Sequence, residues 1–203
     1  SVKDANGTRV SLDPASVVVG PGLRIAGQSL VAPIVFTPGK GGSLTLKRAY
    51  RGKIQVDVVD GKLRAVNVVG LEQYLYGVVP AEMPKDWSAE ALKAQAVAAR
   101  SYALATRNVA APYDAYADTR SQMYLGLSVE SPATTTAVNA TKRQVLMFDG
   151  KVATTYFYST SGGRTESSLD WIGTSLPYLI SVPDPYDAIS PYHDWGPVPL
   201  TAQ

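Results

Sequence analysis

The spacing of apolar residues changes character along this 203-residue chain. In the first seventy residues, short apolar runs at 17–19, 30–36 and 44–46 are separated by glycine and proline, which is typical of strands joined by turns. From Ser88 to about Arg107 the apolar residues recur at helical spacing instead. The pattern predicts an α+β fold, with a β-rich N-terminal lobe and hairpins packed around a central alanine-rich helix.

Two hairpins are predicted, and both use the same turn. Residues 54–58 alternate apolar and polar before Asp60-Gly61 leads into the run 63–69, and residues 145–148 precede Asp149-Gly150 and the run 151–158. Asp-Gly supplies the two positive φ angles of a type I′ turn.

The central helix is predicted from one stripe of small and apolar residues at i, i+4, i+7 and i+11: Leu92, Ala96, Ala99 and Ala103. Either Asp86 or Ser88 would cap it, and Glu90 falls in its first turn. A weaker helical pattern covers residues 134–142. Small residues on the stripe allow a neighbouring element to approach closely, so we expect this helix to be central.

Glu82 stands between Pro80 and Pro84, just before this helix. Because each proline pushes its preceding residue out of the α region, we expect the Glu82 backbone to lie outside any helix. Lys93 and Arg100 are two turns apart and share one helix face. Glu82 is interpreted either as a general acid/base, with these cations holding it or an anionic substrate, or as a carboxylate that caps helix amides beside a solvated face.

Composition and charge exclude several classes of function. A formal charge of +2 without a basic run argues against nucleic acid, and 45% apolar with 18% charged residues describes an ordinary globular protein. The absence of cysteine excludes disulfides and thiol catalysis. A zinc site needs three or four ligands, and the chain offers one histidine and no cysteine for it. We expect no required metal and no cofactor. Twelve tyrosines against three phenylalanines suit carbohydrate recognition as well as packing in a β-sheet.

A glycine-containing loop at 159–165 follows the second predicted hairpin. Together with His193 and Asp194 it supplies the residue types of a Ser-His-Asp set, but the G-x-S-x-G spacing of a nucleophile elbow is missing. A backbone that hydrogen-bonds sugar hydroxyls and a plain connecting turn are the other two interpretations.

Four segments closely resemble the stage II sporulation protein D (SpoIID/LytB) family. They are LEQYLYGVVPAEMP at 71–84, ALKAQAVAARSY at 91–102, YSTSGGRTE at 158–166, and the stretch from PYL at 177–179 to VPDPYD at 182–187. They occur in the family's order and cover roughly residues 45–195, whereas residues 1–44 carry no assigned motif. The resemblance implies a single SpoIID-like domain over 1–203, with a β-rich lobe at 1–70 and a catalytic part at 71–203.

The resemblance also implies a peptidoglycan lytic transglycosylase. Such an enzyme cleaves the MurNAc–GlcNAc bond of glycan strands stripped of stem peptides and leaves 1,6-anhydroMurNAc ends. Glu82 matches the family's catalytic glutamate, and Lys93 and Arg100 match its associated cations. Some relatives bind zinc through a His-Cys pair, where this chain reads DTRSQMY at 118–124, so those ligands are missing.

We expect the glycan to lie in a groove shared by Glu82, the face of the central helix and the loop near residue 162. Arg164 would meet the lactyl carboxylate that removal of the stem peptide exposes. The residues predicted to contact substrate are Lys93, Gln95, Arg100, Gln122, Tyr124, Ser161, Gly162, Gly163 and Arg164.

Two further functions stay open. One is a non-catalytic glycan-binding protein or amidase enhancer, and the other is a glycoside hydrolase with two carboxylates. The expected partners are peptidoglycan glycan strands, with a cell-wall amidase as a candidate, and not nucleic acid. We expect a monomer that is exported and works outside the cytoplasm, in the cell wall or anchored to the membrane through a segment outside this sequence.

Overall fold

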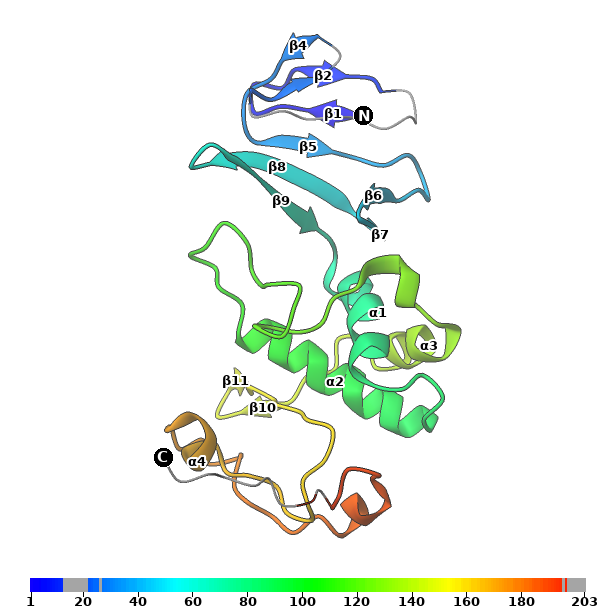
Figure 1. Ribbon diagram of the computed structural model, residues 1–203, viewed down its shortest axis with the longest axis vertical. Coiled ribbons are helices and arrows are strands. Elements are labelled where there is room, and N and C mark those ends of the chain that lie inside the picture. Colours follow the sequence, from blue (N-terminus) through cyan, green and yellow to red (C-terminus); the bar gives the residue numbers. More distant parts are fainter. Residues whose placement is uncertain (13–21, 26, 195, 197–203) are drawn as a thin grey trace. The chain divides into compact units, whose positions relative to one another are not determined.

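The computed structural model describes residues 1–12, 22–25, 27–194 and 196 (Figure 1). The chain divides into two compact units, one of residues 1–147 with 152–155 and the other of residues 148–151 with 156–203. Strands and helices both occur and the N-terminal region is β-rich, which confirms the α+β prediction. The predicted run at 17–19 lies outside the described residues. The prediction of a single domain over 1–203 stays a prediction.

A five-stranded antiparallel sheet forms the N-terminal part of the first unit. Its order is β2-β1-β5-β8-β9, with bounds Arg9–Val10, Val2–Lys3, Ile34–Phe36, Lys53–Val59 and Lys62–Val68. Two small two-stranded sheets accompany it, made of β3 (Arg24–Ile25) with β4 (Gln28–Ser29) and of β6 (Leu44–Leu46) with β7 (Arg48–Tyr50).

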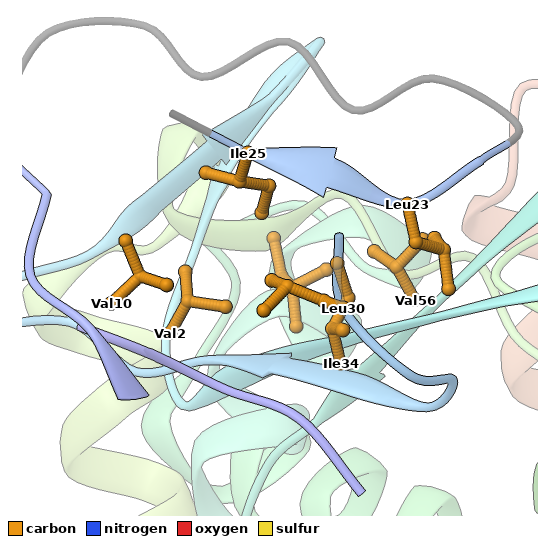
Figure 2. Close-up of a cluster of buried hydrophobic side chains, with 8 residues drawn as sticks. Val2, Val10, Leu23, Ile25, Leu30, Ile34 and Val56 are labelled. Atoms are coloured by element: carbon orange, nitrogen blue, oxygen red, sulfur yellow. The ribbon is translucent and has the colours of Figure 1, made fainter. Parts of the chain in front are cut away.

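Apolar side chains from several of these strands pack into one cluster (Figure 2). Ile34 from β5 is fully buried, and Val56 on β8 alternates with the less buried Gln55 and Asp57. This alternation is the period of two that the sequence shows over residues 54–58. The buried members are Val2, Val10, Leu23, Ile25, Leu30, Ile34, Ile54 and Val56.

Both predicted hairpins turn as expected. Asp60 and Gly61 have φ angles of 49° and 70°, and Asp149 and Gly150 have φ angles of 47° and 72°. Two consecutive positive φ angles define the type I′ turn, so the Asp-Gly signal is confirmed at both places. The second turn joins β10 (Met147–Phe148) to β11 (Lys151–Val152).

Three helices follow the sheet in the first unit: α1 (Leu71–Glu82), α2 (Ala89–Ala105) and α3 (Pro132–Ala140), with the 3₁₀ turn η1 (Gly126–Val129) before α3. Helix α2 matches the predicted helix, begins after the cap Ser88, and packs mainly on α1 and α3. Its stripe of small residues allows this close packing, since Ala96 and Ala99 are fully buried.

The expectation that Glu82 lies outside a helix is wrong. Glu82 is the last residue of α1, and Pro80 lies inside that helix. Burial explains the exception, because Leu75, Val78 and Val79 are fully buried on the α1 face and their packing overrides the cost of an internal proline. Pro84 does push its preceding residue out of the α region, since Met83 is extended and ends the helix.

The second unit has little regular structure. It contains the short helix α4 (Ser168–Ile172), which Ser167 caps and Gly173 ends with a φ of 70°, and the 3₁₀ turn η2 (Pro185–Ile189). Within the part of the chain described here, we find no helix with the length and apolar character needed to span a bilayer.

Candidate active site

The Glu82 carboxylate is held by a backbone amide that lies far along the chain. At the end of α1, its Oε1 accepts a hydrogen bond from the Met123 N–H, with an N···O distance of 2.6 Å. Among the described residues, Oε2 has no hydrogen-bond partner and no cation pairs with the carboxylate. Since the negative end of α1 is at Glu82, the carboxylate is not a helix N-cap, and one of its oxygens is available to a ligand.

The segment that carries Met123 is fixed by the buried residues on either side of it. Gln122 Oε1 accepts from the Tyr74 hydroxyl at 3.3 Å, and Gln122 Nε2 donates to the Ala99 carbonyl at 3.3 Å. The Tyr124 hydroxyl donates to Asn67 Oδ1 at 2.8 Å. Gln122 and Tyr124 are only 2% and 5% exposed, so their predicted role in substrate contact is revised to positioning.

Electrostatics links Tyr74 to Glu82. Burial raises the pKa of the Tyr74 phenol, and the negative charge of Glu82 raises it further. Burial raises the pKa of Tyr124 to about 12, and the two tyrosine rings lie 5.0 Å apart. Both phenols therefore stay protonated near neutral pH and act as hydrogen-bond donors.

Gly77 in α1 makes room for the Tyr124 ring. A Cβ at this position would lie 2.7 Å from Tyr124 Cε2 and 3.1 Å from the Gly126 carbonyl oxygen. The Leu125 N–H also donates to the Gly77 carbonyl at 3.3 Å. A glycine is therefore required here for close approach.

Arg100 is a buried structural cation that pairs with Glu72 and not with Glu82. Its guanidinium makes a two-point contact with the Glu72 carboxylate, through Nε at 3.1 Å and Nη2 at 2.8 Å. The other three N–H groups donate to backbone carbonyls, those of Ala96, Val138 and Gln144. The side chain is 1% exposed and all five donors are used, so the prediction that Arg100 contacts Glu82 or substrate is corrected.

The other two predicted residues of α2 differ from Arg100. Lys93 is partly exposed and pairs with Glu90 at 2.7 Å on the helix surface, so its role in substrate binding stays a prediction. Gln95 is 7% exposed, and its Nε2 has no hydrogen-bond partner among the described residues.

The glycine loop of the second unit is organised by one buried carboxylate, Asp187. Its two oxygens accept from the N–H groups of Ser161 and Gly162, each at 2.9 Å. They also accept from the Thr160 hydroxyl at 2.8 and 2.9 Å, and Asp187 Oδ2 lies 2.8 Å from His193 Nδ1. These two N–H groups are therefore already engaged, and contact between the loop backbone and sugar hydroxyls stays a prediction.

Hydroxyl bonds complete the loop. Ser161 Oγ donates to Asp184 at 2.9 Å and accepts from the Gly163 N–H at 3.2 Å. Gly162 and Gly163 have φ angles of 66° and 93°, so the turn needs glycine at both positions. Ser161 thus has its hydroxyl on Asp184 and not on His193, which argues against the Ser-His-Asp interpretation.

The pKa values of Asp187 and His193 are both shifted by their surroundings. Burial opposes ionisation of Asp187, but bonds from Ser161, His193, Thr160 and Gly162 outweigh burial and lower the pKa of this carboxyl. The hydrogen bond to Asp187 raises the pKa of His193, although burial opposes this change. The charges of Asp184 and Asp194 raise it further.

Arg164 is the cation that the loop offers to a ligand. It lines a cavity of about 550 Å³ in the second unit, together with Ser161 and the aromatic residues Tyr156, Tyr158 and Trp171. Its guanidinium has no partner among the described residues, whereas its backbone bridges to Pro183. The common groove predicted for Glu82 and this loop stays a prediction, because the two belong to different units.

Sequence reasoning missed the residues that hold the site in place. Met123 acts through its backbone, for which a side-chain pattern gives no signal. Glu72 and Asp187 belong to segments already noted for their motifs, and a search for carboxylates able to satisfy a buried arginine or a glycine loop would have found them. In the described part of the chain, no group of three or more His, Asp or Glu side chains is placed to hold a metal.

The match to a family model and the names of two relatives agree with each other. Residues 59–148 match the family model SpoIID, described as stage II sporulation protein. The chain is 44% identical over 114 residues to the amidase enhancer of Bacillus subtilis, covering 56% of this chain and 15% of that protein. It is 31% identical over 171 residues to stage II sporulation protein D of the same organism, covering 76% and 49%.

A third relative is an uncharacterized protein of Brachyspira hyodysenteriae, 38% identical over 133 residues, with 64% of this chain and 36% of that protein covered. The chain thus spans less than half the length of each of these relatives. The matched residues contain α1, α2 and the Met123 segment, and with them the whole surroundings of Glu82 described above. Through this region, the matches confirm that the chain resembles the SpoIID family of stage II sporulation proteins.

Proposed function

We propose that the first unit carries the active site of a peptidoglycan lytic transglycosylase, with Glu82 as its single acid and base. The observation that carries this proposal is the asymmetry of the Glu82 carboxylate. Oε1 is fixed by the Met123 N–H, and Oε2 has no partner among the described residues. A carboxyl with one oxygen fixed by an amide is oriented, and its other oxygen can exchange a proton with substrate.

The reaction needs only this one group. Protonated Glu82 gives its proton to the glycosidic oxygen as the bond from MurNAc C1 breaks. The resulting carboxylate then takes the proton of the C6 hydroxyl of the same sugar, and O6 bonds to C1. The product is a 1,6-anhydro sugar, Glu82 is protonated again, and no water is consumed.

A hydrolase normally needs a second carboxylate, roughly 5 Å away for retention or 6.5 to 9.5 Å for inversion. Asp86 and Glu90 are near Glu82 in sequence, but Glu90 is 81% exposed and paired with Lys93 on α2. The acid/base mechanism with Glu82 alone is therefore favoured over the two-carboxylate hydrolase.

The substrate we propose is a glycan strand without stem peptides, and the proposed location is outside the cytoplasm. Support comes from the 550 Å³ cavity of the second unit, where Arg164 stands among aromatic and hydroxyl side chains. A lactyl carboxylate exposed by peptide removal would bind this guanidinium through a charge-assisted bond worth roughly 1.5 to 3 kcal/mol. Aromatic side chains such as Trp171, which is 61% exposed, suit the apolar faces of sugars.

A second candidate is an enhancer of a cell-wall amidase that binds glycan without cleaving it. The 44% identity to a protein named amidase enhancer supports it. The orientation of Glu82 favours the enzyme, because a binder has no need of a carboxyl poised for proton transfer.

Digestion of peptide-free glycan strands in water enriched in heavy oxygen separates these functions. The transglycosylase gives 1,6-anhydro ends without heavy oxygen, a hydrolase gives reducing ends that contain it, and a binder gives no new ends. Reducing ends with heavy oxygen, or intact strands after prolonged incubation, would refute the proposed activity.

A further inference from the structure

The outer edge of β9 presents a regular row of backbone groups. The type I′ turn at Asp60-Gly61 makes Val59 and Lys62 a hydrogen-bonded pair, and such pairs alternate along an antiparallel ladder. The register of β8 and β9 then assigns the direction of each group in β9. Leu63, Ala65 and Asn67 direct their N–H and C=O groups away from β8.

This edge has no strand beside it in the described part of the chain. β9 is the last strand of the five-stranded sheet, and the backbone groups of Leu63, Ala65 and Asn67 have no hydrogen-bond partner among the described residues. Leu63 and Val68 are 41% and 48% exposed. An unpaired edge of this kind is a template for another strand.

A groove of about 700 Å³ follows this same edge within the first unit. Six consecutive residues of one wall, 64–69, belong to β9 and its end, and the opposite wall is the segment 111–117. Figure 1 shows the connection that follows α2 rising beside β9. Tyr74, Tyr124 and the C-terminal end of α2 complete the lining. A groove bounded by an open strand edge has the form of a site for a strand.

The groove is mostly apolar and tyrosine-lined, with one cation that is loosely held. Arg64 is engaged by Asp57 in a two-point contact, through Nε at 2.9 Å and Nη2 at 2.5 Å. Arg107 is 49% exposed and lies 3.9 Å from Asp114, which is 66% exposed. A pair at this distance and exposure is weak, so Arg107 can bind a carboxylate of a ligand.

We propose that this groove binds an extended polypeptide segment of a partner protein, which adds to β9 as a further strand and turns an acidic side chain to Arg107. An extended backbone repeats donor and acceptor on one edge every second residue, about 6.8 Å. That is the spacing of the outward groups of Leu63, Ala65 and Asn67. Main-chain bonds then supply affinity, and the apolar walls select alternate side chains. This binding site is independent of the catalytic proposal.

A phage-displayed library of random linear dodecapeptides, selected on the intact chain, supplies the probe. Selected peptides are synthesised, and their affinity is measured for the wild type and for two variants at one position. Ala65→Pro removes an outward N–H and leaves the pairing with β8 in place, since proline is tolerated on an edge strand. Ala65→Val keeps the N–H. We expect Ala65→Pro to bind about tenfold more weakly and Ala65→Val to bind as the wild type does.

A second measurement does not depend on any variant folding. In a selected peptide, N-methylation at alternate residues in one register should abolish binding, and N-methylation in the other register should be tolerated. Arg107→Gln should weaken binding of acidic peptides several-fold and reduce its dependence on salt. Failure to select any peptide, equal affinity for Ala65→Pro and Ala65→Val, or indifference to N-methylation in both registers would each overturn the proposal.

Discussion

Replacing Arg100 by methionine should destabilise the first unit far more than any change on the surface of α2. Methionine has a similar length but no hydrogen-bond donor. The Glu72 carboxylate, whose side chain is only 19% exposed, would therefore be left without a cation. The carbonyls of Val138 and Gln144 would also lose the N–H groups that they now accept. The Ala96 carbonyl is less affected, since it is also placed to accept from the α2 backbone.

The magnitude follows from burial. Breaking a buried ion pair by removing one partner costs about 3 to 5 kcal/mol. For a unit of this size, each kcal/mol lowers the melting temperature by about 2 to 4 °C, so the expected fall is about 6 to 20 °C. Because whole domains are stable by only about 5 to 15 kcal/mol, this one contact is a large fraction of the total.

The assay is equilibrium unfolding in urea, compared with Lys93→Met as the matched control. Lys93 lies on the same helix in an exposed pair with Glu90, and losing that pair costs at most about 0.5 kcal/mol. If Arg100→Met does not fold, Glu72→Gln gives the same test from the other side. Equal urea midpoints for Arg100→Met and Lys93→Met would refute the structural role of the buried pair.

Three further predictions follow from the contacts described. The Asp187–His193 pair should stabilise the second unit most between about pH 4 and 6.5. Because the pKa of Asp187 is lowered, its carboxylate stabilises the folded state fully above the unfolded pKa near 3.9. Because the pKa of His193 is raised, its imidazolium stabilises the folded state fully below the unfolded pKa near 6.5, and this stabilisation is lost as pH rises through the folded pKa. A melting temperature that varies with pH in the same way for Asp187→Asn would contradict this. Gly77→Ala should lower the free energy of unfolding by about 1 to 3 kcal/mol through overpacking. The control Gly39→Ala, which would have no atom within 4 Å of its Cβ, should be nearly neutral. Equal stabilities of the two variants would count against the close approach of Tyr124 to Gly77. Glycan cleavage should survive EDTA, and loss of activity that zinc restores would reveal a metal site absent from this account.

Local signals predicted the two hairpin turns and the central helix well, because each depends on neighbours in sequence. The strand predicted over 151–158 instead ends at Val152. Asp60-Gly61 and Asp149-Gly150 need positive φ angles, and both pairs have them. The stripe on α2 needs burial, and three of its residues, Leu92, Ala96 and Ala99, are buried. Turn chemistry and periodicity are therefore sufficient for these elements.

Prediction failed where tertiary packing overrode a local rule. Pro80 was expected to exclude Glu82 from a helix, but the fully buried side chains of α1 keep that helix intact to Glu82. The resemblance still singles out Glu82, since it depends on the motif and not on its backbone conformation.

The site also depends on contacts between distant residues that no local pattern reveals. The Met123 N–H reaches Glu82 across 41 positions, and Arg100 reaches Glu72 across 28. The sequence predicts that Arg100 holds Glu82 or an anionic substrate, whereas the fold pairs it with Glu72. Only the fold distinguishes a buried partner from a catalytic one.

The central claim is that Glu82 performs the proton transfers. Its most direct test is the rate at which the Glu82→Gln variant forms 1,6-anhydro ends on peptide-free glycan strands, with Glu90→Gln as the control for an exposed carboxylate. We expect Glu82→Gln to melt close to the wild type and to lose roughly 10²- to 10⁴-fold or more in rate, since glutamine still accepts the Met123 N–H but cannot exchange the proton. Glu90→Gln should retain the wild-type rate. A folded Glu82→Gln variant that cleaves nearly as fast as Glu90→Gln would contradict the account.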